Sequence, residues 1–122
     1  MAQSSIGALL AKVRRAEVQR IDQKQEERRR AERLGRRHAR RDFPEILAEV
    51  KKLLRKMELG FQRQFLPPKA IHESNHEGEF AGGYRAGLQE LFNEQDKAFE
   101  VEIIYPAHYR GRGAYPYLQV RW

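Results

Sequence analysis

The strongest constraint on the fold of this chain is a long uninterrupted segment near its N-terminus. Residues 5–41 contain no proline and only two glycines, Gly7 and Gly35. Ala, Leu, Glu, Gln and Arg, which all favour helix, make up most of the segment, and Ser4 or Ser5 can cap its start. We therefore expect one long helix, about 55 Å from end to end if it is unbroken, with Gly35 as the place for a bend.

Charge divides the chain into two parts. Of its 24 Lys and Arg, 13 lie in residues 12–41 together with five of the 17 Asp and Glu, which gives that segment a net charge of +8. Residues 42–122 are nearly neutral, with a net charge of −1. A chain of 122 residues has room for a single core. We expect a basic helical arm over residues 1–41 and a small α+β body over residues 42–122.

The body contains two helical patterns and two strand patterns. Residues 42–59 begin with a capping-box variant, Asp42 and Glu45, and their apolar residues recur every three or four positions. A second pattern of this kind spans residues 80–92, whereas residues 61–78 look irregular. Residues 99–105 and 117–122 alternate apolar and polar side chains, as half-buried strands do. The sequence thus predicts an α+β fold, mostly α, with a long basic N-terminal helix, two amphipathic core helices and a C-terminal antiparallel β-hairpin.

An arginine cluster in the second half of the long helix is the main candidate site. Residues 28–41 contain eight Arg and a single acid, Glu32. Apart from the i,i+4 pairs Glu26–Arg30 and Glu32–Arg36, most of these arginines are expected to lack a local partner. A guanidinium group binds phosphate through two hydrogen bonds and stacks on bases. We expect a non-enzymatic protein that binds the backbone of RNA or DNA through Arg28, Arg29, Arg30, Arg33, Arg36, Arg37, Arg40 and Arg41.

This cluster resembles the arginine-rich RNA-binding helices of phage antiterminators and some viral regulators. The likeness is one of composition and is confined to residues 28–41, in which arginines occur singly or in runs of two or three. It implies that the helix binds RNA. Chains of that family are mostly disordered, and this sequence departs from them because it also predicts a folded body.

The other side of the long helix supports a different class of function. Its apolar residues include Ile6, Leu9, Leu10, Val13 and Ile21. A helix with so weak an apolar stripe is not stable alone. It would suit a coiled-coil seam with a second copy, or an arm docked in a larger assembly such as a virion or a ribonucleoprotein. An acidic protein surface would also fit the arginines. A membrane is not expected as a partner, because the apolar side near the arginines lacks Trp and Phe.

The sequence His72-Glu73-Ser74-Asn75-His76 matches the zinc-hydrolase pattern His-Glu-x-x-His. In that pattern two histidines one helical turn apart bind zinc, and the glutamate between them acts as general base. His72 and His76 would be the ligands and Glu73 the base, and a third ligand would have to come from Glu90, Glu94 or His108. The segment is short and mostly polar, so we expect a solvated loop and no cofactor, with a zinc hydrolase as the lesser alternative.

Other sequence features narrow the class of protein. The chain has no cysteine and therefore neither disulfides nor a thiolate metal site. Basic residues follow the first apolar patch, which is the wrong order for a secretory signal. Tyr109, Arg110 and Arg112 could stack on unpaired bases at the tip of the hairpin. We expect an intracellular protein, cytoplasmic or nucleoid-associated, or a virion component, and not a secreted protein.

Overall fold

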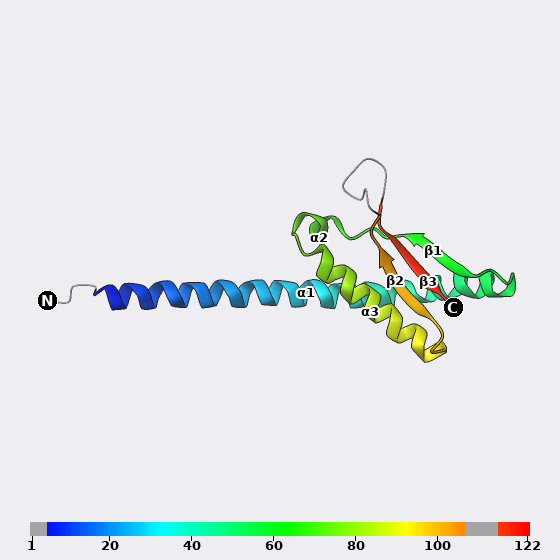
Figure 1. Ribbon diagram of the computed structural model, residues 1–122, viewed down its shortest axis with the longest axis horizontal. Coiled ribbons are helices and arrows are strands. Elements are labelled where there is room, and N and C mark those ends of the chain that lie inside the picture. The colour runs from blue at the N-terminus through cyan, green and yellow to red at the C-terminus, as the bar shows by residue number, and fades with distance from the viewer. Residues whose placement is uncertain (1–4, 107–114) are drawn as a thin grey trace.

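One helix dominates the computed structural model, which describes residues 5–106 and 115–122. This helix, α1 (Ile6–Arg55), has 50 residues and is therefore about 75 Å long. Its first turn is capped by Ser5, whose Oγ accepts a hydrogen bond of 3.2 Å from the backbone N–H of Ala8. The N-terminal half of α1 projects away from the rest of the molecule (Figure 1). The predicted long basic helix and its serine cap are confirmed.

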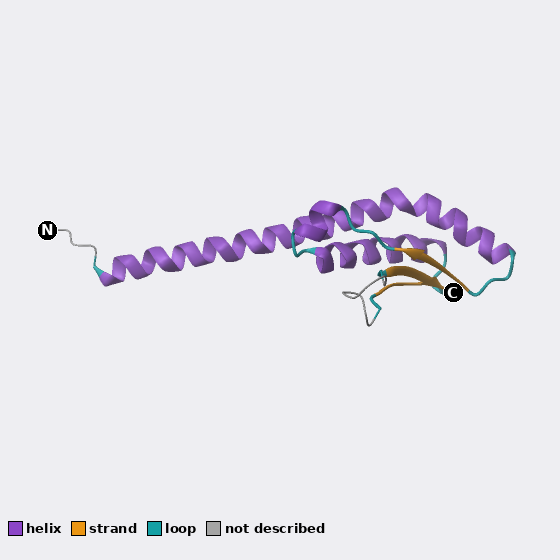
Figure 2. Ribbon diagram, turned by 90° about the horizontal axis from the view of Figure 1, so that it is seen from above, coloured by secondary structure: helices purple, strands orange, loops and turns teal. Residues whose placement is uncertain are grey.

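The helix does not end where the sequence suggested. A second helix was predicted to begin at Asp42, and this was wrong, because α1 runs through Pro44 to Arg55. A proline inside a helix removes one backbone hydrogen bond and bends the axis, and α1 does bend in its second half (Figure 2). Packing offsets the lost hydrogen bond, since the side chains of Ile46 and Val50 in the following turns are fully buried.

The sheet has three strands, one more than predicted. Strands β2 (Glu100–Ile104) and β3 (Tyr117–Arg121) form the expected antiparallel pair. Strand β1 (Gly60–Gln64), in a stretch predicted to be irregular, pairs with the other side of β3, so the order is β1-β3-β2. In this register Phe61, Val120 and Val101 lie side by side across the sheet, and all three are buried.

The core lies between a layer of helices and the sheet. Helix α2 (Lys69–Glu73) is a single short turn, and α3 (Glu77–Gln95) crosses the second half of α1. Figure 2 shows α1 and α3 on one side and the three strands on the other. The largest fully buried side chains come from both layers: Ile46, Val50, Phe80, Leu88, Phe92, Val101, Leu118 and Val120. The predicted class, α+β and mostly α, is confirmed.

Helices α1 and α3 are in backbone contact where they cross. A Cβ atom added to Gly83 of α3 would overlap the carbonyl oxygen of Glu32 in α1. A Cβ on Gly35 of α1 would overlap the carbonyl oxygen of Phe80, and one on Gly87 would lie 2.9 Å from the Cβ of Ala39. Side chains would force the helices apart, so these glycines fix how closely α3 lies on α1.

The predicted boundary between arm and body falls inside α1. Residue 41 is followed by 14 further residues of the same helix, and the first residue of α1 buried in the body is Ala31. The segment before that point, residues 6–26, projects from the body and is called the projecting segment below. Within the described ranges, every helix is too polar or too short to cross a membrane.

Candidate nucleic-acid interface

The structure divides the eight arginines of the cluster between two faces of α1. Arg28 and Arg36 lie toward α3, where each meets an acid of that helix. The other six lie on the face turned away from α3, within an arc of about 120° at 100° per residue. All six are exposed: Arg29, Arg30, Arg33, Arg37, Arg40 and Arg41.

The two arginines that face α3 bind it to α1. Nη1 of Arg36 lies 2.9 Å from Oε1 of Glu90 and forms a hydrogen bond with it. That hydrogen bond and the charge of Glu90 raise the pKa of Arg36 above its ordinary value. Nε of Arg28 lies 3.6 Å from Oε1 of Glu79, near the start of α3. These two arginines therefore form ion pairs that join α1 to α3.

Several arginines on the outer face also have acidic partners. Both predicted i,i+4 pairs are present, Glu26–Arg30 at 3.5 Å and Glu32–Arg36 at 3.8 Å. Glu26 in addition accepts a hydrogen bond of 3.0 Å from Arg33, which lowers the pKa of the carboxyl group. Nε of Arg41 lies 3.0 Å from Oδ1 of Asp42. The expectation that most of the cluster lacks a local partner was therefore wrong, because four of the eight arginines pair with acids of α1. Arg28, the fifth paired arginine, has its partner on α3.

Three arginines remain without an acidic partner among the described residues. Arg29, Arg37 and Arg40 are exposed and take part in none of the ion pairs of the described chain. On a helix, Arg40 lies about 20° from Arg29, and Arg37 lies about 60° from Arg40. These three guanidinium groups lie within about 80° of each other on the outer face and are free to bind an anion.

Because α1 is continuous, three further cations, predicted to lie on a separate helix, extend the same exposed face. Arg29, Arg40 and Lys51 are 11 residues apart, which is close to three helical turns, so they lie nearly in line along the axis. Lys52 and Arg55 follow on the same side and are exposed. We call the whole set the basic strip: Arg29, Arg30, Arg33, Arg37, Arg40, Arg41, Lys51, Lys52 and Arg55. It extends for about 39 Å along α1 at 1.5 Å per residue.

A histidine and a tyrosine lie beside the basic strip, on the side that faces the body. The His38 ring packs edge-on against Phe80, with ring centroids 5.2 Å apart. Burial, followed by the nearby charge of Arg41, lowers the pKa of His38. The hydroxyl of Tyr84 donates a hydrogen bond of 3.0 Å to Oδ2 of Asp42. Asp42, predicted to cap a helix, instead links α1 to α3.

The histidines of the zinc-like motif lie on different elements. His72 is on α2, which ends at Glu73, and Asn75 follows with a left-handed φ of 61°. His76 is the N-cap residue of α3. The motif therefore lacks the single helix on which its two histidines would share a face. In the part of the chain that the structure describes, no group of three or more His, Asp or Glu is arranged to hold a metal ion.

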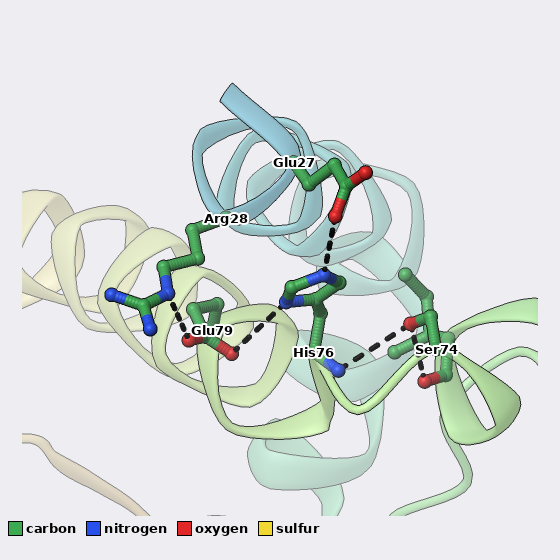
Figure 3. Close-up of polar contacts among 6 residues, drawn as sticks. Glu27, Arg28, Ser74, His76 and Glu79 are labelled. Atoms are coloured by element: carbon green, nitrogen blue, oxygen red, sulfur yellow. Dashed lines mark hydrogen bonds and ion pairs between the residues drawn. The ribbon is translucent and has the colours of Figure 1, made fainter. Parts of the chain in front are cut away.

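The motif's residues have contacts that join elements of the fold. Nε2 of His76 lies 3.2 Å from Oε2 of Glu27 in α1, and its Nδ1 lies 4.0 Å from Oε2 of Glu79. Glu79 in turn pairs with Arg28, so a chain of polar contacts connects the start of α3 to α1 (Figure 3). Nδ1 of His72 lies 3.5 Å from Glu77, and Glu73 lies 3.9 Å from Lys69.

Some predicted residues fall outside the described part of the chain. His108, considered as a third zinc ligand, and Tyr109, Arg110 and Arg112, considered for base stacking, all belong to residues 107–114. Glu90, another candidate ligand, is hydrogen-bonded to Arg36.

Comparison of the chain with protein families, with characterised proteins and with solved structures gives no match.

Proposed function

We propose that this is a non-enzymatic nucleic-acid-binding protein that holds the sugar–phosphate backbone of RNA or DNA with the basic strip of α1. The observation that carries the proposal is the set of three exposed arginines, Arg29, Arg37 and Arg40, which have no acidic partner among the described residues. Unpaired cations gathered on one face repel each other, and a polyanion removes that cost. The setting of such a protein is the cytoplasm, the nucleoid or the interior of a virion.

The dimensions of the strip suit a nucleic-acid backbone. An α-helix is about 10–12 Å across, and the major groove of B-form DNA is about 12 Å wide. The strip of about 39 Å is close to one helical turn of a duplex, about 34–36 Å. Its cations face phosphates, and few side chains on it could discriminate between bases, so the expected binding is weakly dependent on sequence.

The decisive measurement is binding as a function of salt. Labelled duplex DNA, single-stranded DNA and hairpin RNA of mixed sequence are titrated with the full chain between about 50 and 200 mM salt. The variant Arg29→Gln, Arg37→Gln, Arg40→Gln removes three of the phosphate contacts. The slope of log K against log salt should become shallower by about 2 for single strands and about 3 for B-form DNA.

A matched variant removes the same charge elsewhere. Lys69→Gln, Arg85→Gln and Lys97→Gln neutralise three exposed cations on α2, on α3 and in the turn after α3. This control should leave the salt slope almost unchanged. If both triple variants weaken binding equally, net charge rather than the strip is responsible. If the unmodified chain binds none of the three nucleic acids at low salt, the proposed function is wrong.

A further inference from the structure

The projecting segment of α1 has an apolar stripe that nothing in the described chain covers. Ile6 is 77% exposed, and four more side chains on the same side are about half exposed. At 100° per residue the five lie within an arc of about 120°. They are Ile6, Leu9, Leu10, Val13 and Ile21, and we call them the apolar stripe.

The stripe continues a face of α1 that is covered further along the helix. Ala31 and Gly35 lie within about 20° of Ile6 on the helical wheel, and both are buried, Gly35 against Phe80 and Tyr84 of α3. The cover begins at the contacts of Glu27 with His76 and of Arg28 with Glu79, where α3 starts (Figure 3). One long face of α1 is therefore packed over its second half and open over its first.

The two halves of this face differ in side-chain size. The covered half has Ala31, Gly35 and Ala39, which allow α3 to approach the backbone. The open half has branched aliphatic residues, which are the kind found in the seams of paired helices. A helix of about 20 residues with no tertiary contact is marginally stable in water, so a partner helix in line with α3 would stabilise the projecting segment.

We propose that a second copy of this chain pairs with the apolar stripe. The polar residues on the stripe favour this occupant over a lipid surface. Glu17, Arg20 and Lys24 interrupt the stripe, and in an antiparallel pair Glu17 of one copy can lie opposite Arg20 of the other. A bilayer offers no partner to Glu17, and α1 has no aromatic residue before Phe43 to anchor it in a membrane interface.

The pairing leaves the basic strip accessible. The centre of the stripe and the centre of the basic strip are about 150° apart on α1. A pair of chains would thus present two basic strips on its outer sides. The proposal does not depend on nucleic-acid binding, and nuclease-treated protein in high salt is used to test it, so that a bridging nucleic acid cannot imitate a dimer.

The test is sedimentation equilibrium of the full chain, with a glutamate substitution at each of two valines. Val13 and Val18 are 55% and 57% exposed on the same segment, but they point about 140° apart, and only Val13 is on the stripe. The unmodified chain should be a dimer that dissociates on dilution. Val13→Glu should be monomeric at concentrations where Val18→Glu remains dimeric.

Three results would overturn the proposal. The first is an unmodified chain that stays monomeric at all accessible concentrations. The second is equal dissociation of the Val13 and Val18 variants, because the seam would then not follow the stripe. The third is a monomeric chain that binds phosphatidylserine vesicles and loses this binding in Val13→Glu, which would assign the stripe to a lipid surface. Fluorescence of Trp122, which packs on Phe99 in the body, shows that each variant is folded.

Discussion

The crossing of α1 and α3 can be tested with two neighbouring glycines of α3. A Cβ on Gly83 would overlap the backbone of Glu32, whereas a Cβ on Gly82 would have no atom within 4 Å. Both glycines lie inside the helix, so alanine improves helix propensity by about 1 kcal/mol at either position. Gly82→Ala should therefore raise the free energy of unfolding by about that amount.

At Gly83 the same gain is opposed by a steric clash. Overpacking costs about 1–3 kcal/mol when side chains can adjust, and here the obstacle is the backbone of α1, so the upper end of that range applies. The net effect of Gly83→Ala should be a loss of about 2 kcal/mol, which separates the two variants by about 3 kcal/mol. For a chain of this size that difference corresponds to about 12 °C in melting temperature.

The assay is urea denaturation followed by two probes. Trp122 is the single tryptophan of the chain, and its indole N–H donates to the carbonyl of Glu58 at 3.1 Å, so its fluorescence reports on the body. Circular dichroism at 222 nm also includes the projecting segment. Equal stability of the two variants by fluorescence would mean that the helices do not approach at Gly83, and the packing described above would be refuted.

Three further predictions concern single side chains. Met57 has a left-handed φ of 59° at the end of α1, so Met57→Gly should stabilise the protein by about 1 kcal/mol in chemical denaturation. Burial, followed by the charge of Asp42, raises the pKa of Tyr84 above its unfolded value, so the folded state loses stability as pH rises beyond about 10. Tyr84→Phe should make the unfolding free energy less dependent on pH in that range, and an unchanged profile would contradict the burial of the hydroxyl. Ile46→Ala should lower the unfolding free energy by about 2–5 kcal/mol, because Ile46 is fully buried; a loss below 1 kcal/mol would show that the core does not lie there.

Patterns within short stretches of sequence correctly predicted the elements that such patterns specify. The period of three and four in residues 43–57, the alternation in residues 99–105 and 117–122, and the serine at position 5 each specify a structure without reference to the rest of the chain. The break predicted at Asp42 was wrong because a capping residue and a proline can also lie inside a helix when packing offsets their cost. Burial of Ile46 and Val50 provides that packing, and it depends on α3 and the sheet.

Strand β1 and the acidic partners of the arginines on α3 were missed because both depend on residues that are distant in the sequence. The signal for β1 was present, because Phe61, Arg63 and Phe65 alternate with the exposed Gln62 and Gln64. The hydrogen bonds of β1, however, go to β3, more than 50 residues later in the chain. Similarly, Glu79 and Glu90 meet the arginine cluster only because α3 folds back onto α1. Counting charges along a segment shows its net charge but not which cations the tertiary structure engages.

The order of strands has a consequence for how the body forms during synthesis. The strand at the centre of the sheet, β3, is the last of the three to be made. Until residues 117–121 have left the ribosome, β1 and β2 have no strand between them to hydrogen-bond with. The α1 helix, with its local contacts, can form much earlier. A nascent chain would therefore expose its basic helix before it has a folded body, and a nucleic acid or a second chain could reach that helix first.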